Sequence, residues 1–132
     1  MEQTKKRQFN YRGKTIEELK TLDVREFAKL LSSRPRRFVL RNFQQIEDFL
    51  NRANIKIQRK KQIRTHSRDL VIVPQMVGMK IQVHNGKSFV GFEVVSEMLG
   101  HKLGEFALTR SKVTHSKAGV GATKGSKALS KK

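Results

Sequence analysis

The sequence predicts an α+β domain: a small antiparallel sheet built on one β-hairpin, a helical N-terminal region, and extended basic tails at both ends. Two alternating runs flank Asn85-Gly86, a dipeptide that favours a two-residue type I′ turn because both turn positions need positive φ. With that turn, Val83 lies opposite Ser88. One face of the hairpin is then apolar, with Met79, Ile81, Val83, Val90, Phe92 and Val94. The other face is mostly polar, with Lys80, Gln82, His84, Lys87 and Glu93, and has Phe89 as its apolar member.

Capping signals predict two short helices ahead of the hairpin. Thr15 with Glu18, and Asp23 with Glu26, have the spacing in which each side chain caps the other residue's free backbone amide. The apolar residues that follow would give these helices a buried side: Ile16, Leu19, Leu22, Phe27, Leu30 and Leu31.

A longer helix is predicted to begin after Ser32 or Ser33, with Pro35 tolerated in its first turn. Its apolar residues recur at helical spacing and form one stripe: Val39, Phe43, Ile46, Leu50 and Ala53. Four arginines lie mostly off this stripe: Arg36, Arg37, Arg41 and Arg52. They form either the solvated face of an amphipathic helix or a surface that meets phosphates, and the pattern allows both.

Composition divides the chain into four segments: a basic arm at 1–14, a helical region at 15–62, an α+β core at 63–110 and a basic flexible tail at 111–132. The acid-free run 54–68 is predicted to be a flexible or frayed linker on its own, because like charges repel and extend it, and to be ordered when it binds phosphates. Residues 70–73 before Pro74 are predicted to form a short strand, and residues 96–99 a single helical turn that ends at Gly100. The tail has almost nothing to bury, so we expect it to be disordered in the free protein.

The chain of 132 residues carries a formal net charge of +18, and this charge is unevenly distributed. Residues 1–30 have a net charge of +3, residues 31–68 of +9, residues 69–110 of zero and residues 111–132 of +6. A nearly neutral folded unit therefore has basic segments on either side. A surface this basic is expected to bind a polyanion, and nucleic acid is the polyanion we expect.

Composition and motifs argue against several other classes of protein. No apolar run is long enough to span a membrane, and the polar N-terminus does not resemble a signal peptide. Cysteine is absent, which excludes disulfides and thiolate zinc sites and fits an intracellular protein. The four histidines are well separated, so neither a metal site nor a cofactor is predicted. No nucleophile–base pair indicates an enzyme, and Gly119–Gly125 lacks the residue order of a phosphate-binding loop.

The segment Gly100–Phe106 has two glycines in five residues, which suggests tight turns or close approach to a partner. Leu103 and Phe106 are expected to anchor it in the core. The segment then has either a purely structural role or a role in holding His101 and Lys102 toward a phosphate backbone. His101 and Glu105 are four residues apart, but the glycines argue against the helix that such a pair would need.

These residues resemble the small-subunit ribosomal protein nineteen family, in its archaeal and eukaryotic form. The family's signature is present in order: Asn85-Gly86-Lys87, Val94, Leu99, Gly100-His101-Lys102-Leu103-Gly104-Glu105-Phe106 and Thr109. The resemblance covers residues 63–110 closely, through Thr65-His66-Ser67-Arg68-Asp69 and Pro74-Gln75-Met76-Val77-Gly78, and is looser over residues 15–60. The Tyr11-Arg12-Gly13 arm and a tail with His115 also resemble this form of the family.

The resemblance implies a structural protein in the head of the small ribosomal subunit, located in the cytoplasm on the ribosome. Its partners would be the 3′ domain of small-subunit ribosomal RNA, the neighbouring ribosomal protein thirteen and the bridges to the large subunit. The C-terminal tail would reach toward the decoding site and transfer RNA. Neither a membrane nor an enzymatic activity is expected.

The predicted RNA-binding residues are mostly cations. Those expected to neutralise phosphates are Arg36, Arg37, Arg41, Lys56, Arg59, Lys60, Lys61, Arg64 and Arg68, with Lys80, Lys87, His101 and Lys102 fixing orientation. His66, Asn85, Arg110, Lys112, Lys117 and Lys124 complete the set. The apolar hairpin face would pack on the N-terminal helices. Specificity is expected from RNA shape, because few aromatic residues are placed to stack on bases.

Two other functions fit the same composition. A DNA-architectural, chromatin-like protein would use the same charge, although helix-turn-helix and zinc-finger patterns are missing. A protein-interaction module without an RNA role would use the apolar hairpin face as a docking surface, and its binding would survive high salt.

Overall fold

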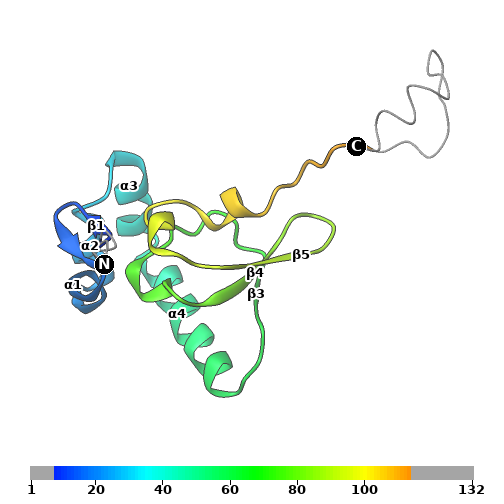
Figure 1. The fold of residues 1–132 in the computed structure, drawn as a ribbon, viewed down its shortest axis with the longest axis horizontal. Coiled ribbons are helices and arrows are strands. Elements are labelled where there is room, and N and C mark those ends of the chain that lie inside the picture. Colours follow the sequence, from blue (N-terminus) through cyan, green and yellow to red (C-terminus); the bar gives the residue numbers. More distant parts are fainter. Residues whose placement is uncertain (1–7, 114–132) are drawn as a thin grey trace, which may run out of the picture.

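The computed structural model describes residues 8–113, and it confirms the predicted α+β fold class. Four helices precede a three-stranded sheet of order β3-β4-β5. Figure 1 shows α1, α2 and α3 gathered at one end, with α4 running from them past the sheet. The flexible tail predicted for residues 111–132 lies almost entirely outside the described residues.

The described part of the N-terminal arm is folded, contrary to the extended arm predicted for residues 1–14. Strands β1 (Asn10–Tyr11) and β2 (Lys14–Thr15) pair antiparallel, and Gly13 has a φ of +80° in the turn between them. The Tyr11 ring packs against Phe27, with 5.9 Å between ring centroids. Apolar contact with the helices therefore draws this part of the arm onto the body.

Helices α1 (Ile16–Thr21) and α2 (Val24–Ala28) confirm the two predicted short helices. The first capping box is present: the Thr15 amide donates to the Glu18 carboxylate at 3.0 Å, and the Glu18 amide donates to the Thr15 hydroxyl at 3.4 Å. The second is wrong, because Asp23 occupies the N-cap position of α2 but its side chain makes no capping hydrogen bond.

The single long helix predicted after Ser32 is in fact two helices, α3 (Ser33–Arg41) and α4 (Phe43–Gln58). The break is at Asn42, which has φ −119° and ψ 26°. Its side-chain amide donates to the Phe38 carbonyl at 3.1 Å, a local bond that competes with a continuous helix. The predicted stripe still faces the core, where Val39, Ile46, Leu50 and Ala53 are buried and Phe43 is half-buried.

The linker predicted for residues 54–68 is also wrong. Helix α4 continues through Gln58, and strand β3 (Ile63–Thr65) pairs parallel with β4. Ile63 lies opposite Ile81 and buries its side chain in the core. A three-residue strand with one buried side chain leaves no alternating pattern to detect, so the pairing shows only in three dimensions.

Strands β4 (Lys80–His84) and β5 (Phe89–Glu93) confirm the predicted hairpin, but the predicted turn is wrong. The loop has four residues, 85–88, and Ile81 pairs with Phe92 and Val83 with Val90. Within this loop only Gly86 has positive φ, at +94°, so the turn is not type I′. The register differs from the prediction by two residues, which keeps every side chain on its predicted face. Ile81 and Val83 are accordingly fully buried.

Residues 70–73 do not form the predicted strand, although they are fully buried. They lie against residues 100–104 through one isolated bridge between Val71 and Lys102, and the Ile72 amide donates to the His101 carbonyl at 2.8 Å. Three short 3-10 turns cover the same region: Pro74–Met76, Ser96–Met98 and Leu103–Phe106. The turn predicted at residues 96–99 is confirmed as Ser96–Met98 with Leu99 at its C-cap, and Gly100 follows with φ +81°.

The half-buried Arg68 guanidinium holds these irregular segments together. It donates to the carbonyl oxygens of His84 at 2.7 Å, Gly104 at 2.8 Å and Ala107 at 2.6 Å. The Gly104 amide donates in return to the Arg68 carbonyl at 2.8 Å. A Cβ atom on Gly104 would lie 2.9 Å from both the Cβ and the carbonyl oxygen of Arg68, so this contact requires glycine.

We predict that Gly104→Ala lowers the free energy of unfolding by roughly 1–3 kcal/mol, because the added methyl group overpacks against the Arg68 backbone. Gly91→Ala is the matched control. Its Cβ would lie 3.4 Å from the flexible Gln82 side chain, and its effect should stay within about 0.5 kcal/mol. Urea unfolding followed by circular dichroism measures both, and equal effects would contradict the prediction.

Arg68→Lys should cost roughly 1.5–3 kcal/mol, because one ammonium group cannot reach three carbonyl oxygens in the geometry of a planar guanidinium. Arg64→Lys is the control, since Arg64 is exposed and donates only to the Gln62 and Gln82 side chains. The same denaturation assay should show a change within about 0.5 kcal/mol for this control. An unaltered midpoint for Arg68→Lys would show that the three bonds add no net stability.

Candidate nucleic-acid interface

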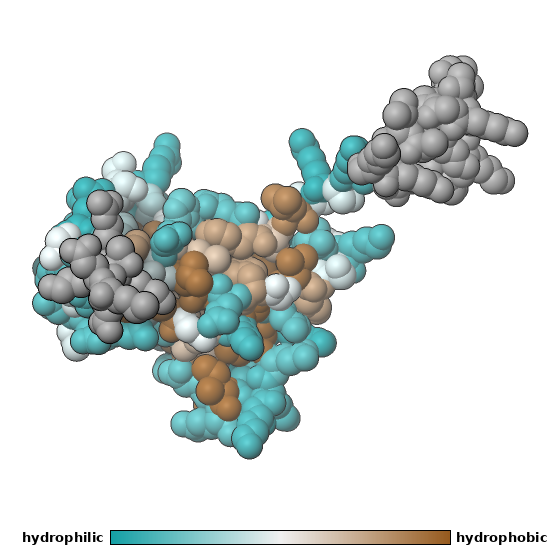
Figure 2. Space-filling view, viewed as in Figure 1, coloured by the Kyte–Doolittle hydropathy of each residue, from teal (hydrophilic) through white to brown (hydrophobic). Residues whose placement is uncertain are grey.

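The cations of the described residues have no acidic partners. Across residues 8–113 no lysine or arginine forms a salt bridge with a carboxylate, and the one close contact between a basic side chain and a carboxylate is a hydrogen bond between His101 Nδ1 and Glu105 at 2.7 Å. Figure 2 shows hydrophilic side chains over the helical end of the molecule and over its lower end in this view, with a strip of apolar side chains between them. The surface charge is therefore free to attract an external polyanion.

The first cationic surface lies on α3, where Arg34, Arg37 and Arg41 line a hollow of about 460 Å³ together with Lys102. Their spacing of three and four residues places these arginines on one side of the helix. The predicted residues Arg37, Arg41 and Lys102 thus come together from two distant parts of the chain. Sequence reasoning missed Arg34, which shares this helical spacing.

The second cationic surface is a groove of about 260 Å³ between α4 and β3. It brings the predicted residues Lys56, Arg64 and His66 together. Arg52 also lines the groove and lies one helical turn before Lys56, and this spacing is the signal that would add it to the predicted set. The Arg64 guanidinium is held in place by Gln82 at 2.9 Å and Gln62 at 2.8 Å.

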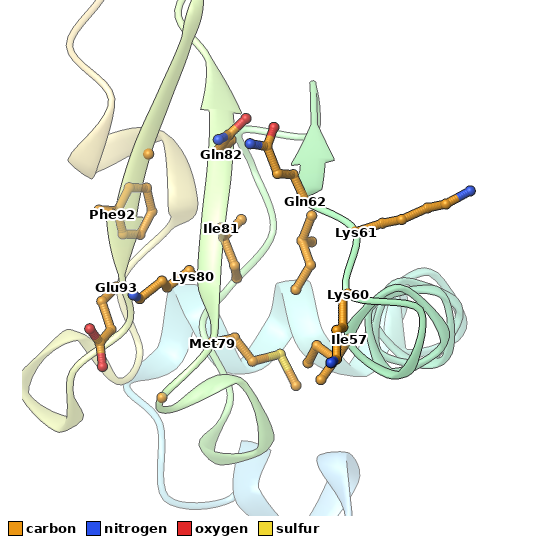
Figure 3. Close-up of a pocket in the computed structure, with 13 residues that line it drawn as sticks. Ile57, Lys60, Lys61, Gln62, Met79, Lys80, Ile81, Gln82, Phe92 and Glu93 are labelled. Carbon is orange, nitrogen blue, oxygen red and sulfur yellow. The ribbon is translucent and has the colours of Figure 1, made fainter.

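The third cationic surface is a hollow of about 580 Å³ between the C-terminal end of α4 and the sheet (Figure 3). Its lining includes the predicted residues Lys60, Lys61 and Lys80 around an apolar floor of Ile57, Met79, Ile81, Phe92 and the neighbouring Ile63. In Figure 3 Met79 and Ile57 point toward one another, while Lys61 extends away from the hollow. Lys60 and Lys80 therefore bring cations to an apolar surface whose lining also includes the acidic Glu93.

The loop end of the hairpin carries the predicted residues Asn85 and Lys87. Lys87 is exposed. The Asn85 side-chain oxygen accepts from the amides of Lys87 at 2.9 Å and Ser88 at 2.8 Å, which holds the loop in one conformation. The Asn85 side chain therefore holds the backbone of Lys87 in position.

Two predicted phosphate ligands have guanidinium groups engaged within the protein. Arg36 donates to the carbonyl oxygens of Lys29 at 3.3 Å and Leu31 at 2.9 Å, just after α2. Arg68 donates to three carbonyl oxygens, which uses three of its five N–H donors. Their assignment to phosphates stays a prediction.

The α-helix that a pair of His101 with Glu105 was expected to need is absent, but the two side chains do meet, because a 3-10 turn over residues 103–106 brings the carboxylate to the ring. Both side chains are about half exposed, so water screens the pair. Within residues 8–113 no three histidine or acidic side chains gather into a possible metal site. His101 is exposed, as is the adjacent Lys102.

The other predicted residues are spread around these surfaces. Arg59, Arg110 and Lys112 are exposed, and Lys117 and Lys124 lie outside the described residues. None of the helices in the described part of the chain has the length and apolar character needed to cross a membrane.

Comparison with known proteins confirms the family resemblance. The sequence profile described as Ribosomal protein S19 matches residues 36–115, which is more than half of the chain. Small ribosomal subunit protein uS19 of Methanocella arvoryzae is 49% identical over 123 residues, which make up 93% of this chain and 86% of that protein. The chain therefore belongs to the ribosomal protein S19 family.

Proposed function

We propose that this protein is a structural constituent of the small ribosomal subunit that binds small-subunit ribosomal RNA through its basic surfaces. The observation that carries the proposal is the absence of any lysine or arginine salt bridge within residues 8–113 of a chain that belongs to this family. A surface with so many unpaired cations has its counter-charge outside the protein.

The distribution of the cationic surfaces supports contact with more than one RNA segment. Helix α4 separates Arg41 before its first residue from Lys60 after its last, and 16 helical residues span roughly 24 Å. The three cationic surfaces also lie on different elements: on α3, between α4 and β3, and between the C-terminal end of α4 and the sheet. The protein would thus be held among several RNA segments, with phosphate contacts that fix its position.

The finer contacts of the proposal come from the family resemblance. They are the 3′ domain of the RNA in the head, ribosomal protein thirteen, the bridges to the large subunit, and transfer RNA near the C-terminal tail. Location on cytoplasmic ribosomes belongs to the same proposal. Cross-linking within intact subunits, followed by identification of the linked nucleotides and proteins, tests each of these contacts directly.

Replacing Lys60 and Lys61 by alanine should weaken RNA binding and flatten its salt dependence. Each phosphate neutralised contributes roughly 0.7–0.9 to the slope of log affinity against log salt, so the double variant should lose roughly 1.4–1.8. Filter binding to an RNA fragment of the 3′ domain at several salt concentrations measures this slope.

The matched control for this titration is the double variant Lys20→Ala with Lys29→Ala. Both lysines are exposed on the less basic helical end and line none of the three cationic surfaces. Its slope should stay close to that of the unaltered protein. If the two double variants flatten the slope equally, binding depends on total charge and the assignment of Lys60 and Lys61 is wrong.

Sedimentation of a cell lysate tests the ribosomal assignment itself. The protein should migrate with small subunits, be released by ribonuclease and be unaffected by deoxyribonuclease. Recovery with chromatin or nucleoid, and release by deoxyribonuclease alone, would support a DNA-architectural protein instead.

A further inference from the structure

Three aromatic rings gather at the loop end of the sheet, and none of the contacts described above accounts for them. His66 and His84 lie with ring centroids 4.5 Å apart and ring planes 31° apart. Phe89 meets both rings edge-on, at 5.2 Å from His66 and 4.9 Å from His84. His66 is exposed and the other two side chains are half-buried, so this aromatic cluster is open to solvent.

Backbone pairing fixes the positions of the three rings. His84 and Phe89 are the cross-strand pair that closes the hairpin, and His66 directly follows β3. The His84 Nδ1 atom accepts from the Gly86 amide at 3.0 Å, so the ring orientation is set and its Nε2 side is left as the donor. The His84 carbonyl is held in turn by Arg68 at 2.7 Å.

One cation lies against this aromatic cluster, and a second is close to it in the sequence. The Arg64 guanidinium carbon lies 5.3 Å from the centroid of the Phe89 ring, and two glutamines hold the guanidinium in place. Lys87 lies two residues before Phe89 on the hairpin loop. Neither cation forms a salt bridge with a carboxylate among the described residues.

We propose that His66, His84 and Phe89 form a stacking platform for one unpaired base of an RNA strand, whose phosphates Arg64 and Lys87 neutralise. The inference rests on the proposed function and adds a base contact to it. Rings that stack on bases beside cations that follow the backbone are the combination that binds single-stranded nucleic acid. An apolar protein side chain would also cover the rings, but it would leave both cations unpaired.

This platform changes the expectation drawn from the sequence, which relied on RNA shape because few aromatic residues are placed to stack. His66 lies 18 residues before His84 in the chain, and the parallel pairing of β3 with β4 brings it to the other two rings. Single-stranded loops and bulges expose the bases that such a platform can hold.

The test is Phe89→Leu in the full-length protein, with a nine-nucleotide single-stranded RNA that carries 2-aminopurine at its centre as the probe. Leucine removes the ring but keeps an apolar side chain. Affinity should fall about fivefold, because one base loses its stacking contact. The salt slope should not change, because stacking releases no counterion. Stacking quenches the fluorescence of 2-aminopurine. The probe should therefore be quenched less in its complex with Phe89→Leu than in its complex with the unaltered protein.

Phe43→Leu is the matched control. Phe43 also lies under an arginine, with the Arg25 guanidinium carbon 3.9 Å from its ring centroid, but it is on α4 and outside the aromatic cluster. It should leave affinity and quenching unchanged. Equal losses in both variants, or none in Phe89→Leu, would overturn the inference. A slope reduced by about one phosphate would also overturn it, because Phe89 would then act only by positioning Arg64.

A second measurement does not depend on the stability of the leucine variant. Photoreactive p-azidophenylalanine at position 89 keeps the ring, and irradiation in intact small subunits should attach it to ribosomal RNA. Attachment to protein alone would overturn the platform while leaving the proposed function intact. Failure of the unaltered protein to enter small subunits would instead reject the proposed function, and the platform with it.

Discussion

The guanidinium of Arg68 satisfies three carbonyl oxygens from segments that no regular sheet connects. Residues 100–107 pair with residues 70–73 through scattered backbone bonds, and this leaves the carbonyl oxygens of Gly104 and Ala107 to be satisfied by a side chain. Arginine meets this need because its planar fork points several donors in fixed directions. The absence of a side chain at Gly104 lets the backbones of Arg68 and Gly104 approach closely enough for these bonds to form.

Local signals in the sequence identified the elements better than the pairings between them. The Thr15 capping box and the alternation along the hairpin depend on near neighbours, and both are present in the structure. The pairing of β3 with β4 joins residues that are 18 positions apart, such as Ile63 and Ile81. A three-residue strand carries no sequence pattern that would predict this pairing. The length of the hairpin loop was predicted wrongly for another reason. A register shift of two residues keeps every side chain on the same face, so the alternating pattern does not distinguish a two-residue loop from a four-residue loop.

The candidate interface shows the same division. Charge in the sequence identified most of the cations, but not which of them lie together. Lys102 joins the arginines of α3 only because residues 100–104 fold back across the core. Nor does charge reveal that Arg36 and Arg68 bond to the protein's own carbonyl groups. Such assignments depend on where backbone carbonyls end up, which is a property of the fold.

The unpaired cations also bear on the stability of the free protein. Mutual repulsion among them opposes the compact state, because no carboxylate within residues 8–113 forms a salt bridge with a lysine or arginine. A polyanion that binds only the folded chain shifts the folding equilibrium in proportion to its affinity. On the proposed function, ribosomal RNA then supplies the counter-charge that the sequence omits, and folding and assembly become thermodynamically linked. The Arg68 contacts hold the neutral core together, so the cationic surfaces are already positioned when RNA arrives.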